Sequence, residues 1–272
     1  MLIDVCSYSQ SLKRLWADTF GDNEDYINLF FDCGYTPSEC FAEISDGEVI
    51  SVLYLLKGYI KYGNMTFEGR YLYAAATRKK YRGKGFMGKL ICEAKEYVVR
   101  NNISFISLVP ANEGLYGYYA RFGFSPIMKN FVSVKDDIGL DSDGCPLDAK
   151  AFINLRNHLP EPYFSFHEKE WIYALSCLEY ADYSIIRNTE DSCYILNDVD
   201  NEILEYVSSE KNFTKNTEIF LNRIKDGAVI VSPYDLSSFC PCTERKFGML
   251  YIADGKMKEC INDAVYMNIA LD

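Results

Sequence analysis

Histidine is scarce in this chain: among 272 residues it occurs only as His158 and His167. Histidine is the commonest metal ligand in proteins and the usual base of Ser-His-Asp and Cys-His catalytic groups. Ten cysteines are present but scattered, and the single close pair, Cys240 and Cys242, lacks the C-x-x-C spacing of a zinc site. We therefore expect no metal site and no covalent catalysis by a histidine-activated nucleophile.

Long apolar segments are also missing. No run approaches the roughly 18 apolar residues that a transmembrane helix needs, and the first residues, MLIDVCSYSQSLKR, lack the apolar core of a signal peptide. We therefore expect a cytoplasmic protein that neither spans a membrane nor is secreted. Its cysteines should then be reduced.

The net charge of −11 is unevenly distributed along the chain. Residues 1–135 hold 16 basic and 14 acidic residues, hence +2, whereas residues 136–272 hold 12 and 25, hence −13. Such an acidic field disfavours nucleic-acid binding, because it repels phosphates. A polar stretch over residues 139–144 separates the two parts, so we expect two domains, 1–135 and 136–272.

The stretch from Tyr71 to Phe124 combines elements in an order that predicts an anion site. Residues 71–77 are aromatic, aliphatic or small and carry no charge, as in a strand buried on both faces. A turn with five basic residues and two glycines follows, and apolar residues at helical spacing begin at Phe86. Glycines before a helix leave the N–H groups of its first turn open to an anion, which the helix dipole also favours. The turn therefore predicts a phosphate-binding site.

Three kinds of phosphate-binding turn compete for this sequence. The string GKGFMG, Gly83 to Gly88, fits the dinucleotide pattern G-x-G-x-x-G, but no acidic residue follows about 20 residues later to hold a ribose. The Walker pattern G-x-x-x-x-G-K-[ST] is absent. The third pattern is R-x-x-G-x-[GA] after a central strand, the pyrophosphate loop of coenzyme A acyltransferases. Residues 82–88, RGKGFMG, approach it.

Together with the segment that follows, this turn resembles two linked motifs of the GNAT superfamily of N-acetyltransferases, over roughly residues 1–130. The segment from Asn112 to Phe124 is similar to the family's N-x-x-[AL]-x-x-[LY]-Y-x-[KR]-x-G-F. One departure is Met87, where the family usually has Gly or Ala. Eis-type acetyltransferases resemble this sequence in carrying a larger apolar residue there. The resemblance implies an acyltransferase that uses acetyl-CoA as co-substrate.

The resemblance also implies roles for individual residues. Tyr119 matches the tyrosine that protonates the departing thiolate, and among three neighbouring tyrosines it stands four residues before Gly123. The backbone of the central strand would hold the thioester carbonyl, and the turn with the start of its helix would hold the pyrophosphate. The implied cofactor-binding residues are Ala75, Ala76, Thr77, Arg82, Gly83, Lys84, Gly85, Phe86, Met87, Gly88 and Asn112.

The order of elements predicts an α/β (α+β) fold. Strands over 41–44, 49–61 and 65–77 precede the glycine turn, which fits a GNAT fold with a central mixed, mainly antiparallel sheet flanked by helices, and not a Rossmann fold. The order after residue 136 is similar, so we expect a second, degenerate GNAT-like domain. Between Gly144 and Gly227 there is no glycine, and this second domain should therefore not bind coenzyme A.

Two functions remain open from sequence alone. The first is transfer of an acetyl group from acetyl-CoA to a primary amine, of a cationic small molecule or a peptide, by direct attack in a ternary complex. The second is a non-catalytic, GNAT-derived protein that senses acyl-CoA or binds a partner. No general base can be assigned, although Glu68 and Glu113 lie near the relevant elements.

The acceptor side is less well defined by the sequence. Trp16, Tyr26 and Phe30 lie in the region that helps to form the acceptor cleft in the family, and the acidic residues at 22, 24 and 25 fit a helix N-terminus. The acidic second half could form a wall that attracts cationic amines. Eis-type enzymes place their terminal carboxylate in the acceptor site, a role that would fall here to Asp272.

Overall fold

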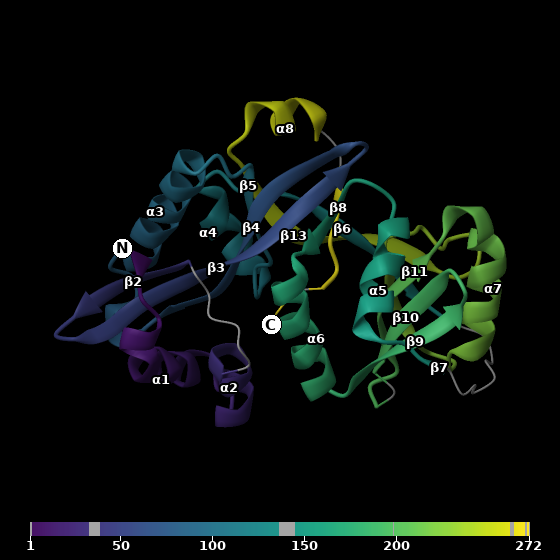
Figure 1. Ribbon diagram of the computed structural model, residues 1–272, viewed down its shortest axis with the longest axis horizontal. Helices are drawn as coiled ribbons and strands as arrows, with labels where there is room; N and C mark the ends of the chain where they lie inside the picture. Colours follow the sequence, from purple (N-terminus) through teal and green to yellow (C-terminus); the bar gives the residue numbers. More distant parts are fainter. Residues whose placement is uncertain are drawn as a thin grey trace.

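The computed structural model describes residues 2–32, 39–135, 145–197, 199–261, 264–269 and 271. Both strands and helices occur in each half of the described chain, and Figure 1 shows the two halves lying side by side with α6 between them. The elements of the first half are β1 Leu2–Ile3, α1 Ser9–Phe20, α2 Glu24–Asp32, β2 Cys40–Ser45, β3 Glu48–Tyr62, β4 Met65–Thr77, α3 Phe86–Arg100, β5 Phe105–Leu108, α4 Glu113–Ala120 and β6 Ser125–Val134. Those that follow are β7 Cys145–Pro146, α5 Ala149–Leu155, the 3₁₀ turn η3 Arg156–His158, β8 Tyr163–Phe166, α6 Glu168–Tyr180, β9 Tyr183–Thr189, β10 Ser192–Asn197, β11 Glu202–Ser208, the 3₁₀ turn η4 Glu210–Asn212, α7 Phe213–Arg223, β12 Val229–Ser232, β13 Cys242–Ile252, α8 Gly255–Cys260 and β14 Val265–Tyr266.

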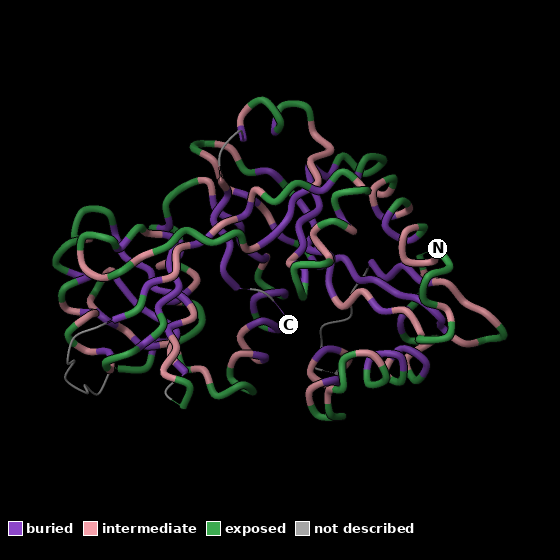
Figure 2. The backbone as a smooth tube through the Cα atoms, turned by 180° about the vertical axis from the view of Figure 1, so that it is seen from behind, coloured by how far each residue is buried: buried purple, intermediate pink, exposed green. Residues whose placement is uncertain are grey.

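Strand β3 has helices on both sides, which explains why most of its residues are apolar. Leu53 and Leu55 point toward α3, and Val52 and Tyr54 point toward α1 and α2. Alternate residues of a strand face opposite sides of the sheet, so both sets are buried. Figure 2 shows buried backbone running along these central strands and exposed backbone along the outer loops. The first half is therefore a sheet between two helical layers.

Strand β4 pairs with β5 in parallel for only three residues, from Gly69 opposite Phe105 to Tyr71 opposite Ser107. Gly69 permits this close pairing, because a Cβ there would lie 2.1 Å from the ring of Phe105. Beyond Tyr71 no further pairing joins these two described strands. The parallel strands therefore part toward their carboxyl ends, the edge at which α/β sheets bind ligands.

The far side of β5 is covered by a strand from the end of the chain. β13 pairs antiparallel with β5, Met249 opposite Leu108, and also with β6, Cys242 opposite Ser133. β13 belongs to residues 136–272, yet it lies in the sheet between β5 and β6. The division at residues 135 and 136 stays a prediction, and the two parts of the chain share one sheet.

The second half continues that sheet through β12, β11, β10, β9 and β7, so that the described residues form a single sheet of fourteen strands. β8 pairs with β3 and with β14, and β14 pairs with β6. Strands β3, β4, β5, β13, β6, β14 and β8 thereby form a closed circuit. Its interior holds aromatic rings such as Phe105, Phe164 and Tyr71, with Phe164 and Phe105 centroids 6.3 Å apart.

A buried ion pair connects the elements of this junction. Arg156 of η3 pairs with Glu205 of β11, and these two residues are 3% and 0% exposed. Tyr266 of β14 donates its hydroxyl to the other oxygen of Glu205 at 2.9 Å, and Arg156 also donates to the carbonyl of Phe164 at 3.2 Å. The Arg156 guanidinium lies 4.7 Å from the ring of Trp171 in α6. This one cluster therefore ties three strands and a helix together.

The predicted α/β class is confirmed, with a mixed sheet flanked by helices. Among the described residues, no helix combines the length and apolar character that crossing a membrane requires.

Candidate active site

A cavity of about 530 Å³ opens where β4 and β5 part. Two strands, the segment after β5 and helices α1 and α4 contribute its walls. The lining residues are Trp16, Phe20, Asp22, Tyr71, Leu72, Tyr73, Ala74, Ala75, Leu108, Val109, Pro110, Ala111, Leu115, Tyr119 and Leu271. Most of them are apolar or aromatic, as is typical of a site that binds a small molecule.

A bulge in β4 turns its backbone toward this cavity. Val52 pairs with Ala76 and Tyr54 pairs with Tyr73, so two residues of β4, at 74 and 75, face a single residue of β3. Ala74 has φ of +44°, which is unusual for any residue other than glycine. Of the predicted strand residues, Ala75 lines the cavity, whereas Ala76 is buried in the core on the other side. The two consecutive alanines therefore lie in different environments, as neighbouring residues of a strand do.

Thr77, the last of the predicted cofactor-binding residues of the strand, forms hydrogen bonds with other residues of the protein. Its hydroxyl lies 2.8 Å from that of Ser51, and its carbonyl accepts a hydrogen bond of 2.9 Å from Nε of Arg82. Arg82 is exposed, and this bond joins it to the end of β4. The guanidinium is thus held next to the turn that precedes α3.

The turn before α3 has the backbone that the glycine pattern predicts. Gly83 and Gly85 have φ of +76° and +84°, and a Cβ on either would meet no described atom within 4 Å. Gly85 is the N-cap of α3, and no described side chain caps the helix there. The first N–H groups of α3 therefore face open space, and the left-handed glycines keep it free of side chains. These residues fit a bound pyrophosphate.

The first three residues of α3, Phe86, Met87 and Gly88, pack against neighbouring side chains. Met87 packs against the core below α3, so its larger side chain points away from the open face of the turn. A Cβ on Gly88 would lie 3.0 Å from the ring of Phe122, so this glycine lets α3 approach the segment after α4. Phe86 packs edge-to-face on Tyr81, with centroids 6.0 Å apart.

The basic residues around the turn have different environments. Arg78 donates to the carbonyl of Val49 at 2.8 Å and pairs with Glu48 at 3.0 Å and Asp18 at 3.3 Å, so its charge is balanced internally. Lys84 is exposed, with Nζ 5.2 Å from the ring centre of Tyr81. The turn therefore contributes fewer free positive charges than its sequence suggests.

The three neighbouring tyrosines of α4 differ in their surroundings. Tyr116 donates its hydroxyl to the carbonyl of Phe247 at 3.1 Å, and Tyr118 packs on Phe122 with centroids 5.3 Å apart. Tyr119 lines the cavity and is 7% exposed. Burial, and to a lesser degree the neighbouring Tyr118, raises the pKa of Tyr119 to about 12. Its hydroxyl therefore carries its proton at neutral pH.

The remaining polar candidates lie outside the cavity. Asn112 is exposed at the N-cap of α4, and Glu113 is exposed in the first turn of that helix. The carboxylate of Glu68 lies 2.8 Å from Nε2 of His167, the N-cap of α6, and Glu68 does not line the cavity. Glu68 and Glu113, the two carboxylates that lie near the relevant elements in sequence, are not among the described residues that line the cavity.

Acceptor-side residues come from the first helix and the turn after it. Trp16 lines the cavity, as the sequence suggested, together with Phe20 and Asp22. Phe30 is fully buried behind Trp16, with centroids 5.0 Å apart, and Tyr26 packs on Tyr180 of α6. The latter two residues therefore do not line the cavity.

Several residues that line the cavity were not identified from the sequence, among them Tyr71, Tyr73 and the segment 108–111. Val109-Pro110-Ala111 directly follows a buried strand, and a ligand site at the carboxyl end of a parallel strand is the signal that could have identified it. Leu271 also lines the cavity, although it lies far away in sequence. Asp272, the predicted terminal carboxylate, lies outside the described residues.

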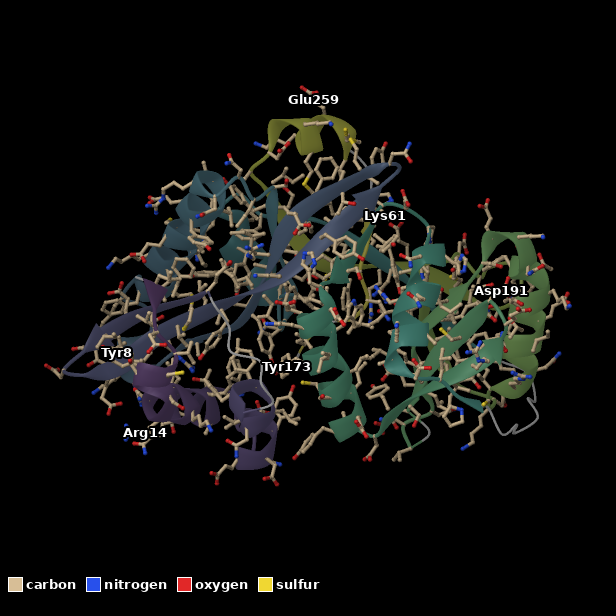
Figure 3. The ribbon with its side chains drawn as sticks, in the orientation of Figure 1. Tyr8, Arg14, Lys61, Tyr173, Asp191 and Glu259 are labelled. Atoms are coloured by element: carbon tan, nitrogen blue, oxygen red, sulfur yellow. The ribbon has the colours of Figure 1, made fainter. Side chains whose placement is uncertain are left out.

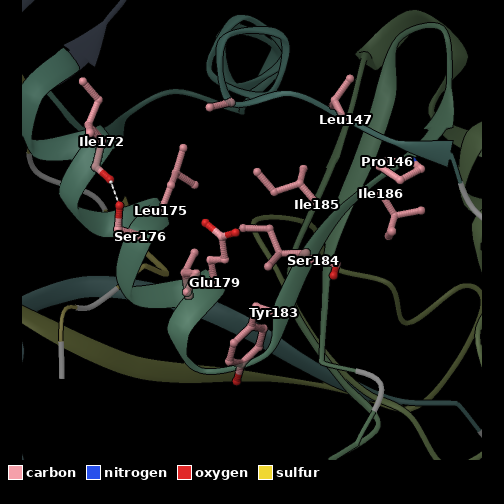
Figure 4. Close-up of a pocket in the computed structure, with 13 residues that line it drawn as sticks. Pro146, Leu147, Ile172, Leu175, Ser176, Glu179, Tyr183, Ser184, Ile185 and Ile186 are labelled. Atoms are coloured by element: carbon pink, nitrogen blue, oxygen red, sulfur yellow. Dashed lines mark hydrogen bonds between the residues drawn. The ribbon is translucent and has the colours of Figure 1, made fainter. Parts of the chain in front are cut away.

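A second hollow, of about 500 Å³, lies between α6, β9 and β7 and is apolar. Figure 4 shows Leu175, Ile185 and Leu147 around it, with the carboxylate of Glu179. The hydroxyl of Ser176 is bonded to the carbonyl of Ile172 at 2.9 Å, which leaves it poorly placed for catalysis. The cavity at the parting of β4 and β5 is therefore the better candidate for chemistry.

Comparison with known proteins gives a family match in the first half of the chain. Residues 7–127 match the family model described as an acetyltransferase (GNAT) domain. A search of the curated proteins finds no match.

Solved structures show the same fold at low sequence identity. A GCN5-related N-acetyltransferase from Kribbella flavida has a TM-score of 0.68 at 15% identity, over 93% of this chain and 72% of that one. Eis1 from Mycobacterium abscessus has a TM-score of 0.68 at 9% identity, over 93% and 73%. A GCN5-related N-acetyltransferase from Anabaena variabilis has a TM-score of 0.65 at 17% identity, over 90% and 70%.

The family match covers β4, the glycine turn, α3 and α4, the elements that form the cavity and the anion-binding turn, so residues 7–127 match a GNAT acetyltransferase domain.

Proposed function

We propose that this protein transfers the acetyl group of acetyl-CoA to a primary amine of a cationic small molecule or peptide, by direct attack in a ternary complex. The observation that carries the proposal is the cavity between the parted strands β4 and β5. It is lined on one side by the bulged backbone at Ala75 and on the other by the protonated hydroxyl of Tyr119. A thioester between them would meet both a polar backbone and a proton donor.

In this proposal the turn and the start of α3 bind the pyrophosphate. Gly83 and Gly85 keep the approach open, and the first N–H groups of α3 donate to the anion. Arg82, held by its bond to Thr77, adds a positive charge. The N–H groups of Lys84, Phe86, Met87 and Gly88 complete the turn, and Asn112 lies at the start of α4, on the same side of the parted strands. The backbone from Ala75 to Thr77 holds the acyl arm.

The chemical step needs one proton donor. The lone pair of the neutral amine attacks the thioester carbonyl carbon, so a C–N bond forms and the carbonyl oxygen becomes negative. When the C–S bond breaks, the thiolate of coenzyme A takes the proton of Tyr119, and the amide nitrogen releases a proton that returns to the tyrosinate. The products are the N-acetylated amine and free coenzyme A. General acid catalysis of this kind contributes about 10²–10⁴-fold.

One acetyl-CoA should bind per chain, since the described part of residues 136–272, proposed as a second, degenerate domain, has no comparable turn. In this second half, the carboxylate of Asp191 lies at the start of α7. Asp191 accepts hydrogen bonds from Asn212 at 2.8 Å and from Asn216 at 2.9 Å, and also from Ser209. Donors that could hold an external anion are therefore used internally.

The test is a screen for thiol release from acetyl-CoA in the presence of polyamines, aminoglycosides, amino acids and peptides. We expect release that depends on a cationic amine, with a KM that rises with ionic strength, because the net charge of −13 on residues 136–272 attracts the acceptor. Acetyl-CoA binding without turnover of any amine would instead favour a non-catalytic acyl-CoA sensor. A KM independent of salt would remove the electrostatic part of the proposal.

A further inference from the structure

The cavity contains one charged side chain. Among the described residues that line it, Asp22 carries the only carboxylate, and none of them is basic. No described lysine, arginine or histidine forms an ion pair with Asp22. A carboxylate without a cationic partner, in a mostly apolar cavity, attracts a positive ligand more strongly than one on an open surface.

The position of Asp22 is fixed by the end of α1. Gly21 terminates that helix with φ of +80°, and its N–H bonds to the carbonyl of Ala17 at 3.0 Å. This left-handed residue reverses the chain, so that Asp22 returns over the helix it has just left. The indole N–H of Trp16 then donates to Oδ2 of Asp22 at 2.7 Å.

Trp16 itself is held firmly. It is 3% exposed, and its ring packs against Phe30, Tyr54 and Tyr73 at centroid distances of 5.0, 6.2 and 5.6 Å. The donor to Asp22 is therefore a rigid part of the core, and it engages only one of the two carboxylate oxygens. The ring of Phe20, 45% exposed and 5.7 Å from Trp16, adds an aromatic surface at the same wall.

We propose that Asp22 holds a second positive charge of the acceptor, apart from the amine that reacts. The reacting amine must be neutral to attack, so it gains little from a carboxylate, whereas a second ammonium or guanidinium group stays charged throughout the reaction. Asp22 supplies the charge, and the ring of Phe20 supplies a face that also favours cations. This inference rests on the proposed function and narrows its acceptor to diamines, polyamines or peptides with a nearby cation. Asp22 thus determines which acceptor is preferred and takes no part in the chemical step, since it contacts the acceptor at a distance from the reacting atoms.

The experiment compares two acceptors of equal length, 1,4-diaminobutane and butylamine, with wild type, Asp22→Asn and the control Asp25→Asn. Asp25 lies three residues further on, is exposed in the first turn of α2 and does not line the cavity. A charge-assisted contact is worth about a 10- to 100-fold difference in binding. We therefore expect Asp22→Asn to lower the ratio of kcat/KM for diamine over monoamine by that factor, mainly through the KM of the diamine. Asp25→Asn should leave the ratio unchanged.

An equal loss with both acceptors, or a fall in kcat with KM unchanged, would overturn the inference, because Asp22 would then act as a base or a structural residue. Calorimetry with spermidine and coenzyme A separates this inference from the proposed function. If the wild-type protein acetylates no amine, the proposed function fails. The inference about Asp22 is then tested by the affinity for spermidine alone. Spermidine binding that Asp22→Asn weakens about 10- to 100-fold supports it. Absent binding, or binding unaffected by the substitution, overturns it.

Discussion

The hydroxyl of Tyr73 in β4 lies 2.9 Å from the hydroxyl of Tyr173 in α6. Tyr73 lines the cavity, and Tyr173, labelled in Figure 3, belongs to the helix between the two halves. Both residues are buried. The wall of the candidate active site is therefore joined directly to the second half of the chain, which gives residues 136–272 a structural part in the site.

Removing either hydroxyl of this pair should destabilise the protein. A buried hydroxyl that loses its partner costs about 1–3 kcal/mol, so we expect Tyr173→Phe and Tyr73→Phe each to lower the free energy of unfolding by about that amount. The double variant should cost less than the sum of the two, by about 0.5 kcal/mol or more. Urea unfolding of all four proteins measures this coupling, and strict additivity would show that the contact contributes nothing.

The buried pair of Arg156 and Glu205 should show a larger effect. Arg156→Met leaves the Glu205 carboxylate without its cation, and such a loss costs about 3–5 kcal/mol. Adding Glu205→Leu removes the unpaired charge as well, so we expect part of this stability to return. Urea unfolding is again the measurement. A double variant less stable than Arg156→Met would contradict the explanation.

Binding of acetyl-CoA should depend on Arg82. Arg82→Glu places a carboxylate where the proposed pyrophosphate lies, and we expect the Kd for acetyl-CoA to rise about 10- to 100-fold. Arg100→Glu is the matched control, because Arg100 lies at the other end of α3 with a side chain that is 70% exposed. Calorimetry should give one site per chain. Two sites, or affinity retained in Arg82→Glu, would contradict the proposed binding mode.

Asp191, labelled in Figure 3 near α7, should make stability depend on pH in the acidic range. Burial of the carboxylate raises its pKa, but hydrogen bonds from Ser209, Asn212, Asn216 and Thr189 outweigh burial and hold the pKa of Asp191 well below its usual 3.8. Because the folded-state pKa is the lower one, the stabilisation is present above about pH 4 and is lost as the pH falls further.

Asp191→Asn tests this expectation. The difference in free energy of unfolding between wild type and variant should be largest at neutral pH and shrink below about pH 4. Glu190→Gln changes an exposed neighbouring carboxylate and should show no such trend. A difference between wild type and Asp191→Asn that is constant from neutral to acidic pH would contradict the account.

Much of the first half could be predicted from sequence, because its signals are local. Alternation and apolar runs predict β3 and β4, helical spacing from Phe86 predicts α3, and the glycine turn predicts the open helix N-terminus. The resemblance to the GNAT motif singled out Tyr119 among three neighbouring tyrosines, and of these three Tyr119 lines the cavity. These features depend on backbone rules and residue spacing, which a single sequence displays directly.

The remaining features depend on contacts between distant segments. Nothing local in residues 242–252 indicates that this strand enters the sheet between β5 and β6. Arg78 is one of the five basic residues of the turn in sequence, whereas in the structure its charge is balanced by Glu48 and Asp18. Asp22 fitted a helix cap, yet it accepts the N–H of Trp16 at the cavity wall, since Gly21 reverses the chain between them. Partners of this kind are determined by tertiary packing.

The central claim is that the cavity performs acetyl transfer with Tyr119 as the proton donor. The most direct test is kcat for thiol release from acetyl-CoA at saturating amine, in Tyr119→Phe and in the packing control Tyr118→Phe. We predict that Tyr119→Phe lowers kcat by about 10²–10⁴-fold while the affinity for acetyl-CoA is retained, and that Tyr118→Phe changes kcat little. An unchanged kcat in Tyr119→Phe, when the chemical step limits turnover, would contradict the account.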